Sequence, residues 1–451
     1  MIVMKFGGTS VQNEEAIGRV ISIVGSRLNE KPLVVVSALS KVTRLLCSMA
    51  DEAECQHEEN VRELLSQLRG RHSGLAERLL ADSPKLLGNA LADVEDLIKG
   101  LETFVIGVCL IGELSPRSKA RIISTGELLS STIIGYAFNA NGISCRWIDA
   151  RRMVVTDDNY LGARPDLEVT EANVRRIVRS ASKGVDLVLT QGFIASTDSG
   201  AASVLGFEGS DYSAAIFGMA LGARRIEIWT DVDGIRTADP RMVADTEKID
   251  VISYEEAAEM AAMGARVLHP LTIEPARRRN IPILVLNSGN PECGGSLVVR
   301  DDDAPDGPKS IAVRDKIVFV KVVSGKMEGV TRMIGKTFSA LYARHVPVVL
   351  AKSTESEVSL VFPEETGALE DALSEIGGWA DVTVFRDKAF ISVIGRNIEG
   401  FGGIGDNVIG AAGRVYLADV GGNMLSESFV VDSDRLKDTL DELHGYIFKA
   451  I

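Results

Sequence analysis

A lysine and two glycines lie at the end of the first apolar run of the chain, where they could bind phosphate. The run is Ile2–Phe6, and it continues into Lys5-Phe6-Gly7-Gly8-Thr9-Ser10. Glycine lets the backbone approach phosphate oxygens and present N–H groups to them, and the lysine could bring positive charge to a γ-phosphate. The spacing is not that of the Gly-x4-Gly-Lys-Ser/Thr loop. A tight turn without a ligand is the alternative interpretation.

A second glycine-containing loop precedes a helical run. The loop is Gly206-Phe207-Glu208-Gly209-Ser210-Asp211, and the run is Tyr212–Leu221. The N-terminus of a helix attracts anions because its N–H groups are free and its dipole is positive there. Asp211 could orient a lysine and the reacting groups at such a site. It could also act as the helix N-cap, and the two roles are compatible.

Three further polar segments could complete a binding site. Thr230–Ile235, followed by Thr237–Arg241, comes after an apolar run and could hold a base and ribose, although a plain β-turn has the same Asp- and Gly-rich composition. Glu127, within Ser124–Leu129, could receive the amino group of a substrate or could only stabilise the first turn of a helix. The turn from Ser37 to Thr43 leaves the same two possibilities open.

The elements that must position these residues are predicted by the hydrophobic pattern. Apolar runs without alternation indicate strands buried on both faces of a parallel sheet. Helical patterns separate them, so the sequence predicts an α/β fold, a three-layer αβα domain over residues 1–290. A stretch that is helical only, about residues 45–112, is predicted as an insertion with breaks near Gly70 and Ser83-Pro84. The candidate strands are Ile2–Phe6, Leu33–Ser37, Ile143–Ile148, Val185–Gln191, Arg225–Thr230 and Ile281–Leu286.

The C-terminal part contains a weak internal repeat with an offset of about 70 residues. Val318–Val323 is matched by Phe390–Ile394, and Ser356-Glu357 is matched by Ser426-Glu427. Each copy has the pattern of a βαββαβ unit. We predict a turn-rich linker at 291–310, a first unit at 311–385 and a second unit at 386–451.

Composition excludes several classes of protein. The 451 residues include 49 Lys and Arg against 63 Asp and Glu, a net charge of −14. Nucleic-acid binding is disfavoured because it needs a basic surface. The five cysteines have no CxxC spacing, which favours free thiols in a reducing cytoplasm and gives no indication of a metal site. No apolar run has membrane-spanning length, and the N-terminus does not have the pattern of a signal peptide.

In combination and in their order, these motifs resemble those of the aspartokinase family of the amino acid kinase superfamily. The resemblance covers nearly the whole chain, and the C-terminal part resembles the tandem ACT domains of that family, which bind regulatory amino acids. The stretches that carry it are Met4–Val11, Val36–Ala38 with Thr43, Ser124–Leu128, Gly192–Ile194, Gly209–Asp211, Thr230–Ile235, Thr237–Arg241 and Ala257–Pro270.

The resemblance implies transfer of the γ-phosphoryl group of ATP, with Mg²⁺, to the β-carboxylate of L-aspartate. It implies that Lys5 and Asp211 are catalytic. It implies that substrate is bound by Ser37, Thr43, Glu127 and Ser210, with Glu127 facing the ammonium. It implies nucleotide contacts at Lys5, Gly7, Gly8, Ser10, Thr230, Asp231, Arg236, Arg241 and Arg266. No protein ligand for a metal is implied.

The sequence departs from the family pattern in the second loop. The family usually has Gly-Arg-Gly-Gly-Ser-Asp, with an arginine that clamps the substrate α-carboxylate, whereas this chain has Phe207 and Glu208. Loss of a charge-assisted contact costs roughly 1.5–3 kcal/mol. A new carboxylate at about 4 Å would repel an anion by up to roughly 4 kcal/mol. Arg236 and Arg266 also replace a tyrosine and a lysine of the family.

Three readings of this departure stay open at the level of sequence. The protein could be an ordinary aspartokinase in which another cation replaces the arginine. It could be a kinase of the same fold for a different amino-acid carboxylate, or a weakly catalytic regulatory homologue. The tail leads us to expect an amino-acid effector and a homodimer or higher homo-oligomer. We also expect a single-function chain without a fused dehydrogenase domain.

Overall fold

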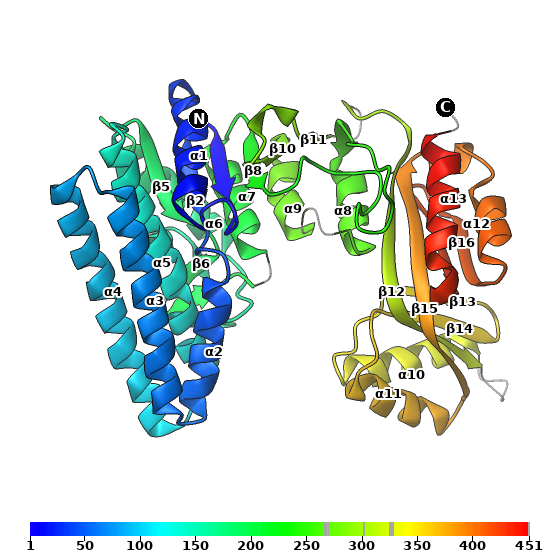
Figure 1. Cartoon of the computed structure of the whole chain (residues 1–451). Coiled ribbons are helices and arrows are strands. Elements are labelled where there is room, and N and C mark those ends of the chain that lie inside the picture. Colours follow the sequence, from blue (N-terminus) through cyan, green and yellow to red (C-terminus); the bar gives the residue numbers. More distant parts are fainter. Residues whose placement is uncertain (207, 266–267, 269, 301–302, 324–328, 450–451) are drawn as a thin grey trace. The chain divides into compact units, whose positions relative to one another are not determined.

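The computed structural model describes residues 1–451 except 207, 266–267, 269, 301–302, 324–328 and 450–451 (Figure 1). The chain forms two compact units. The first contains residues 1–235 and 268–300, and the second contains residues 236–267 and 301–451. Within the part of the chain that is described, no helix is both long and apolar enough to cross a membrane.

The sheet of the first unit is mainly parallel, as predicted. Seven of its strands lie in the order β3, β5, β2, β1, β8, β10 and β11. Among the pairings described for these seven strands, β11 runs antiparallel to β10 and the others are parallel. All six candidate strands are confirmed as members of this sheet. Their bounds are β1 Val3–Phe6, β2 Leu33–Val36, β3 Cys145–Trp147, β5 Leu187–Gln191, β8 Ile226–Thr230 and β10 Ile283–Asn287, and β11 is Ser296–Val299.

Helices cover both faces of this sheet. Gly135 of α5 packs against Leu189 of β5, and Gly218 of α7 packs against Ile226 of β8. The strand register puts Ile226 in one row with Val188, which precedes Leu189 in the chain. Because neighbouring residues of a strand point to opposite faces, α5 and α7 lie on opposite faces, and the three-layer prediction is confirmed. The helices are α1 Glu14–Gly25, α5 Pro116–Ala140, α6 Leu167–Ala181, α7 Gly209–Leu221 and α9 Pro270–Arg278.

Three long helices, α2 Val42–Glu54, α3 Glu58–Leu79 and α4 Pro84–Ile111, pack beside α5 (Figure 1). The predicted break at Ser83-Pro84 is confirmed, with Ser83 as the N-cap of α4. The predicted break near Gly70 is wrong, because α3 continues through it. Neighbouring helices hold α3 together, and this outweighs the cost of one glycine, about 1 kcal/mol.

A small sheet is formed by β4 Val155–Thr156, β6 Ile194–Thr197 and β7 Ala202–Val204. It leads from β5 to the start of α7, so it sets where the second glycine-containing loop lies. The interval predicted as a linker, 291–310, contains β11 and the first residues of β12. Ser296 and Leu297 of β11 pair with Val285 and Leu284 of β10, so the sheet takes up a segment that looked like a loop in the sequence.

The second unit is built on one antiparallel sheet with the order β13, β14, β12, β15, β17 and β16. The predicted repeat is visible in the element order, strand-helix-strand-strand-helix, which occurs twice. The first copy has β12 Gly307–Val323, α10 Val330–Tyr342, β13 Leu350–Ser353, β14 Glu357–Phe362 and α11 Gly367–Gly377. The second has β15 Asp381–Arg396, α12 Ile404–Ala412, β16 Val415–Asn423, β17 Ser426–Asp432 and α13 Leu436–Phe448.

The two copies share their long strands, β12 and β15. The C-terminal part of β12 pairs with β14, while β12 pairs with β15 along nearly its whole length. Each copy therefore obtains its fourth strand from the other. Separate apolar clusters lie under the helices of each copy, and a third, which includes Phe319 and Phe390, contains residues of both copies.

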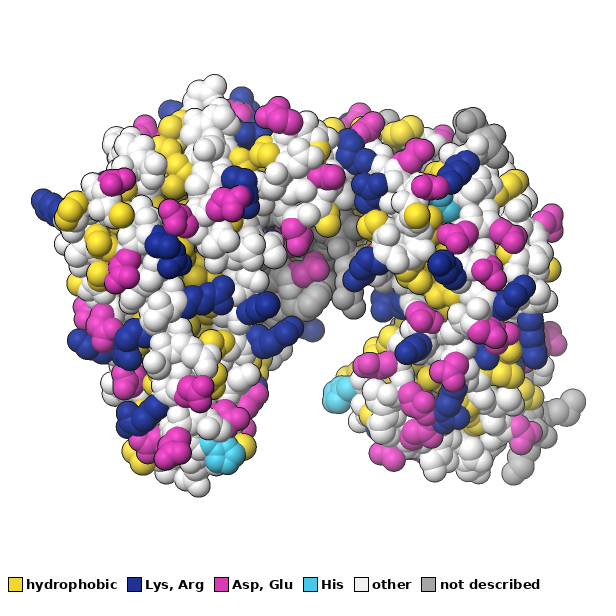
Figure 2. Space-filling model, viewed as in Figure 1, with side chains coloured by type: hydrophobic (Ala, Val, Ile, Leu, Met, Phe, Trp, Pro, Cys, Tyr) yellow, Lys and Arg dark blue, Asp and Glu magenta, His cyan; other side chains and the backbone are white. Residues whose placement is uncertain are grey.

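The second unit also contains β9 Val251–Ser253 and α8 Tyr254–Ala262. Ala238 and Val243, which precede them, belong to the apolar cluster under α12 and α13. Residues 236–267, which we predicted within the N-terminal domain, are therefore grouped with the C-terminal strands. In the space-filling view, acidic and basic side chains are interspersed over the visible face (Figure 2).

Candidate active site

Lys5 and Asp211 form a buried ion pair. Lys5 lies in β1 and Asp211 lies in the first turn of α7, with 2.6 Å between Nζ and Oδ1. The side chains are 8% and 12% exposed. The pair joins the two glycine-containing loops that the sequence singled out, although 205 residues or so separate them in the chain. The sequence predicted that Asp211 could orient a lysine, and in the structure its partner is Lys5 of the first motif.

The turn after β1 is held against the turn after β2. Ser40 N–H donates to the Gly8 carbonyl at 3.1 Å, and a Cβ on Gly8 would lie 3.0 Å from the Ala38 carbonyl oxygen. Any larger residue at position 8 would force these turns apart. Ser10 is 2% exposed, and its hydroxyl is 2.7 Å from that of Ser288. The hydroxyl of Ser10 thus ties the first turn to the end of β10.

A cavity of about 330 Å³ opens where these turns meet the start of α7. It collects Gly8, Ser37, Thr43, Glu127 and Ser210, which the sequence predicted for nucleotide or substrate binding. Its other lining residues are Ala38, Leu39, Ser40, Lys41, Phe193, Gly206, Glu208 and Gly209. Three glycines expose backbone to the cavity, so a phosphate group could approach it closely.

Glu127 is a buried carboxylate in the wall of this cavity. It lies in the interior of α5, which begins at Pro116, so the prediction that Glu127 stands in the first turn of a helix is wrong. Its side chain is 3% exposed. Oε1 accepts a hydrogen bond from the Ala38 N–H at 3.3 Å, and Oε2 has no partner in the described part of the chain. Burial raises the pKa of Glu127 to about 8, against the effect of the Ala38 hydrogen bond. A buried carboxylate with one unpaired oxygen is suited to receive an ammonium group.

The third motif lies at the end of β8. Thr230 is half-buried, and its hydroxyl donates to Asp231 at 3.1 Å, while Asp231 is exposed. Arg236 and Arg241, two other predicted nucleotide contacts, belong to the second unit. There Arg236 donates to the Thr246 hydroxyl at 2.7 Å, and Arg241 forms a two-point contact with Asp239. Arg266 lies outside the described residues, as does Phe207.

Sequence reasoning missed the role of Lys41 as a lining residue. Nothing in Ser40-Lys41-Val42 distinguishes it from any exposed lysine before a helix. Lys41 has φ 69°, in the left-handed region that few non-glycine residues adopt, and the sequence gives no signal of this. Glu208, which the sequence marked as a departure, also lines the cavity and has φ 53°.

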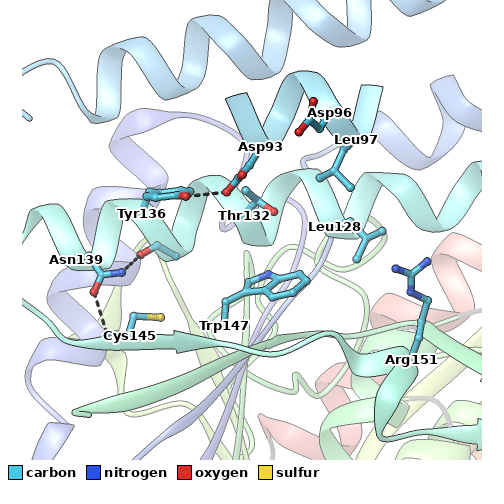
Figure 3. Close-up of a pocket in the computed structure, with 11 residues that line it drawn as sticks. Asp93, Asp96, Leu97, Leu128, Thr132, Tyr136, Asn139, Cys145, Trp147 and Arg151 are labelled. Atoms are coloured by element: carbon cyan, nitrogen blue, oxygen red, sulfur yellow. Dashed lines mark hydrogen bonds between the residues drawn. The ribbon is translucent and has the colours of Figure 1, made fainter. Parts of the chain in front are cut away.

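A second cavity of about 580 Å³ lies between α4, α5 and β3 (Figure 3). Trp147 lies in its wall, and the Tyr136 hydroxyl donates to Asp93 at 2.6 Å. Asn139 is occupied by hydrogen bonds to the Gly135 carbonyl and the Cys145 N–H. None of the predicted catalytic, nucleotide or substrate residues lines it. We therefore take the cavity of about 330 Å³ as the candidate active site, although the other cavity is larger.

No cluster of three or more potential metal-ligating side chains occurs among the residues that are described. Mg²⁺ commonly binds through phosphate oxygens, water and one or two carboxylates. Asp211, next to the glycine loops, is a carboxylate that could take part.

The sequence matches the model of the amino acid kinase family over residues 1–287. Lysine-sensitive aspartokinase 3 of Escherichia coli (strain K12) is 31% identical, over 100% of this chain and 99% of that protein. Chloroplastic aspartokinase 3 of Arabidopsis thaliana is also 31% identical, over 99% of this chain and 82% of that protein.

Solved structures agree. The structure of E. coli aspartokinase III with aspartate and ADP has a TM-score of 0.85, at 31% identity, covering 99% of this chain and 100% of that one. The structure of the same enzyme with lysine and aspartate has a TM-score of 0.81, at 30% identity and 99% coverage of both chains. Sequence and fold are thus shared over nearly the whole length, and the chain belongs to the aspartokinase family.

Proposed function

We propose that the protein transfers the γ-phosphoryl group of ATP to the β-carboxylate of L-aspartate and forms 4-phospho-L-aspartate. The observation that carries this is Glu127, a buried carboxylate with a free oxygen, in one cavity with Gly8 and Ser210. It supplies a partner for an ammonium group beside a glycine loop. The E. coli relative with aspartate and ADP supports the same substrates.

In the proposed mechanism, the chain mainly positions charges. Lys5 stabilises the negative charge on the transferring phosphoryl group, and Asp211 holds its ammonium in place through the ion pair. Gly7 and Gly8 allow the phosphates to approach the backbone. Mg²⁺ bound to the nucleotide neutralises phosphate charge. The aspartate β-carboxylate then attacks the γ-phosphorus in line, and ADP leaves.

Substrate and nucleotide contacts are proposed to follow the family pattern. Glu127 binds the ammonium of aspartate, with Ser37, Thr43 and Ser210 as polar neighbours of the same cavity. Thr230 and Asp231, at the end of β8, are proposed to contact the nucleotide, as are Ser10, Arg236, Arg241 and Arg266. The Ser10 hydroxyl is also hydrogen-bonded to that of Ser288 at 2.7 Å.

A second candidate is a kinase of the same fold that acts on another amino-acid carboxylate. Glu208 favours it, since this carboxylate lines the cavity and would repel an anionic substrate. A weakly catalytic regulatory homologue is the third candidate. Retention of the Lys5–Asp211 pair and of Glu127 argues for an enzyme.

The test is ADP release from MgATP by the full-length protein, with L-aspartate, other amino acids and aspartates blocked at either carboxyl group. We expect saturable turnover with L-aspartate and a product that hydroxylamine traps as a hydroxamate. Turnover with another panel member alone would favour the second candidate. No ADP release with any amino acid, while the protein still binds ATP, would favour the third candidate.

A variant of the loop sharpens this test. Phe207→Arg with Glu208→Gly recreates the family sequence, so it should raise kcat/KM for aspartate. An unchanged value would contradict our interpretation of the loop.

We also propose that the second unit binds an amino-acid effector and that the protein is a cytoplasmic homodimer or higher homo-oligomer. The E. coli relative is a lysine-sensitive aspartokinase, which supports lysine as the first effector to try. The loop Arg396–Gly405 before α12 is a candidate for this site, while its counterpart at 324–331 falls largely outside the described residues. Sedimentation of the full chain tests the assembly, and a monomer at micromolar concentration would contradict it.

A further inference from the structure

Among the described residues that line the active-site cavity, Lys41 is needed to supply a positive charge for the carboxylate of a zwitterionic ligand. Two carboxylates line the cavity, those of Glu127 and Glu208. Lys41 is the one cationic side chain among its described lining residues. An α-amino acid has an ammonium and an α-carboxylate side by side. With the ammonium at Glu127, the α-carboxylate needs a positive partner within the same cavity.

Lys5 is not available for this role. Its ammonium is 2.6 Å from Asp211, and it does not line the cavity. In the proposed reaction it serves the phosphoryl group. Lys41, in contrast, has no ion-pair partner in the part of the chain that the structure describes, and its side chain is exposed. It can therefore turn into the cavity without breaking an existing contact.

The backbone of Lys41 has a strained left-handed conformation, and this conformation sets the direction in which its side chain leaves the turn. Lys41 precedes Val42, the first residue of α2, and has φ 69° and ψ −4°. A left-handed backbone favours glycine, and other residues keep it at a cost of about 1 kcal/mol or more. The preceding residue, Ser40, is hydrogen-bonded to Gly8, so the turn is held at the cavity mouth. The N-terminus of α2 begins at the next residue, and its positive dipole would attract the same anionic group as the Lys41 ammonium.

We propose that Lys41 binds the α-carboxylate of the amino-acid substrate, so that the ligand is held between Lys41 and Glu127 with its β-carboxylate left for phosphoryl transfer. This rests on the proposed function and deepens it, because it names the cation that sets the substrate specificity. Lys41 then compensates for the phenylalanine at position 207. The substrate class is an α-amino acid with a second, acceptor carboxylate.

The test uses kinetics of the full-length protein and a matched control. Lys41→Gln should raise KM for L-aspartate roughly 10- to 100-fold, with KM for ATP unchanged and kcat at saturation within about twofold. Lys41→Arg should recover a large part of the affinity, because it restores the charge. Lys31→Gln is the control, since Lys31 is also exposed and left-handed at φ 52° but does not line the cavity.

A truncated substrate identifies the group that Lys41 contacts. 3-Aminopropanoate is aspartate without its α-carboxylate, so Lys41→Gln should leave its kcat/KM unchanged within about twofold. Equal losses for both substrates would overturn the proposed contact. Lys41→Gly should raise KM for aspartate in the same way and raise Tm, because glycine relieves the left-handed strain, so a lost affinity cannot be attributed to unfolding.

The outcomes separate this inference from the function on which it rests. Wild-type turnover of aspartate together with an unchanged KM in Lys41→Gln would overturn the role of Lys41 and leave the proposed function standing. No turnover or binding of aspartate by the wild type would overturn the proposed function itself.

Discussion

Glu127 shows how one side chain can couple stability to ligand binding. Its carboxyl is buried, its Oε2 is unpaired, and burial raises its pKa to about 8. Near neutral pH the empty site therefore holds a proton on Glu127. An ammonium from a ligand replaces the proton, so binding should be tighter as pH rises towards 8.

The sign of the stability effect follows from the same shift. The folded state keeps the Glu127 proton up to a pH of about 8, whereas the unfolded chain releases it near the ordinary value of 4.5. Between these values the folded state binds more protons, so this group's contribution to stability falls as pH rises from about 5 to about 8. Glu127→Gln removes this dependence. As pH rises from 5 to 8, we expect the difference in Tm, variant minus wild type, to increase by at least about 2 °C.

Calorimetry of the two proteins without ligand at a series of pH values measures this difference. Parallel curves of Tm against pH for wild type and variant would show that the pKa of Glu127 is not raised, and would contradict its proposed role as a buried carboxylate that receives an ammonium group.

The Lys5–Asp211 pair gives a second prediction at the scale of the residue. Lys5→Met removes the charge and leaves a buried carboxylate without its cation. We expect kcat to fall by about 10²- to 10³-fold or more, because the charge acts on the transition state. Lys31→Met, an exposed lysine of the same unit, is the control. A Lys5→Met enzyme within tenfold of wild type would exclude the catalytic role.

At the scale of the element, the end of β5 and the start of α7 are in close contact. A Cβ on Gly192 would lie 2.6 Å from Ser210 Cβ and 2.7 Å from its Cα, and one on Gly209 would lie 2.9 Å from Phe193 Cδ2. These glycines let strand and helix approach until Ser210 reaches the cavity and Asp211 reaches Lys5. The position of the Asp211 carboxylate therefore depends on the absence of two methyl groups.

Gly192→Ala should displace the first turn of α7. We expect kcat/KM to fall at least about tenfold, and stability to fall by about 1–3 kcal/mol, as for other overpacked sites. Gly88→Ala in α4 is a matched control, since a Cβ there meets nothing within 4 Å. The control should be neutral or more stable by up to about 1 kcal/mol, the helix propensity difference. Equal activities of both variants would refute the close-contact argument.

At the scale of the whole molecule, residues 236–267 belong with the second unit and not with the strand that precedes them. Glu256 of α8 is fully buried there. Its Oε2 accepts from the Ser253 N–H, and its Oε1 accepts from the Arg396 N–H at the end of β15, both at 2.8 Å. Thr237 also contacts His444 of α13 at 2.9 Å. A segment with two predicted nucleotide contacts is thus tied to the strands of the candidate effector-binding unit.

Glu256→Gln tests the importance of this connection. One amide oxygen cannot replace two carboxylate oxygens, so one buried N–H loses its acceptor, at a cost of about 1–3 kcal/mol. We expect denaturant unfolding to show this loss and effector inhibition to weaken. Glu442→Gln, an exposed change in α13 of the same unit, is the control. Unchanged stability and inhibition would mean that the contact does not contribute to either.

Local pattern determined much of this protein from sequence alone. The six apolar runs became strands because they are apolar on both faces, and the repeated strand-helix order predicted the second unit. Glycines after the first strand drew attention to Lys5 and Gly8, a glycine loop before a helix to Ser210 and Asp211, and a predicted helix start to Glu127. The structure brings Gly8, Glu127 and Ser210 to one cavity and pairs Lys5 with Asp211. Parallel strands bring their carboxyl ends together, so such motifs can be placed without coordinates.

Other features depended on contacts that no local pattern encodes. The helix through Gly70 is held by neighbouring helices, and β11 is a strand because β10 offers it a free edge. The burial of Glu127 and the left-handed backbone of Lys41 arise from turns packed against each other, more than 80 residues apart in the case of Glu127 and Ala38. Charge and residue type are written in the sequence, whereas burial, strain and the partner of each charge come from long-range packing, which only the tertiary structure decided.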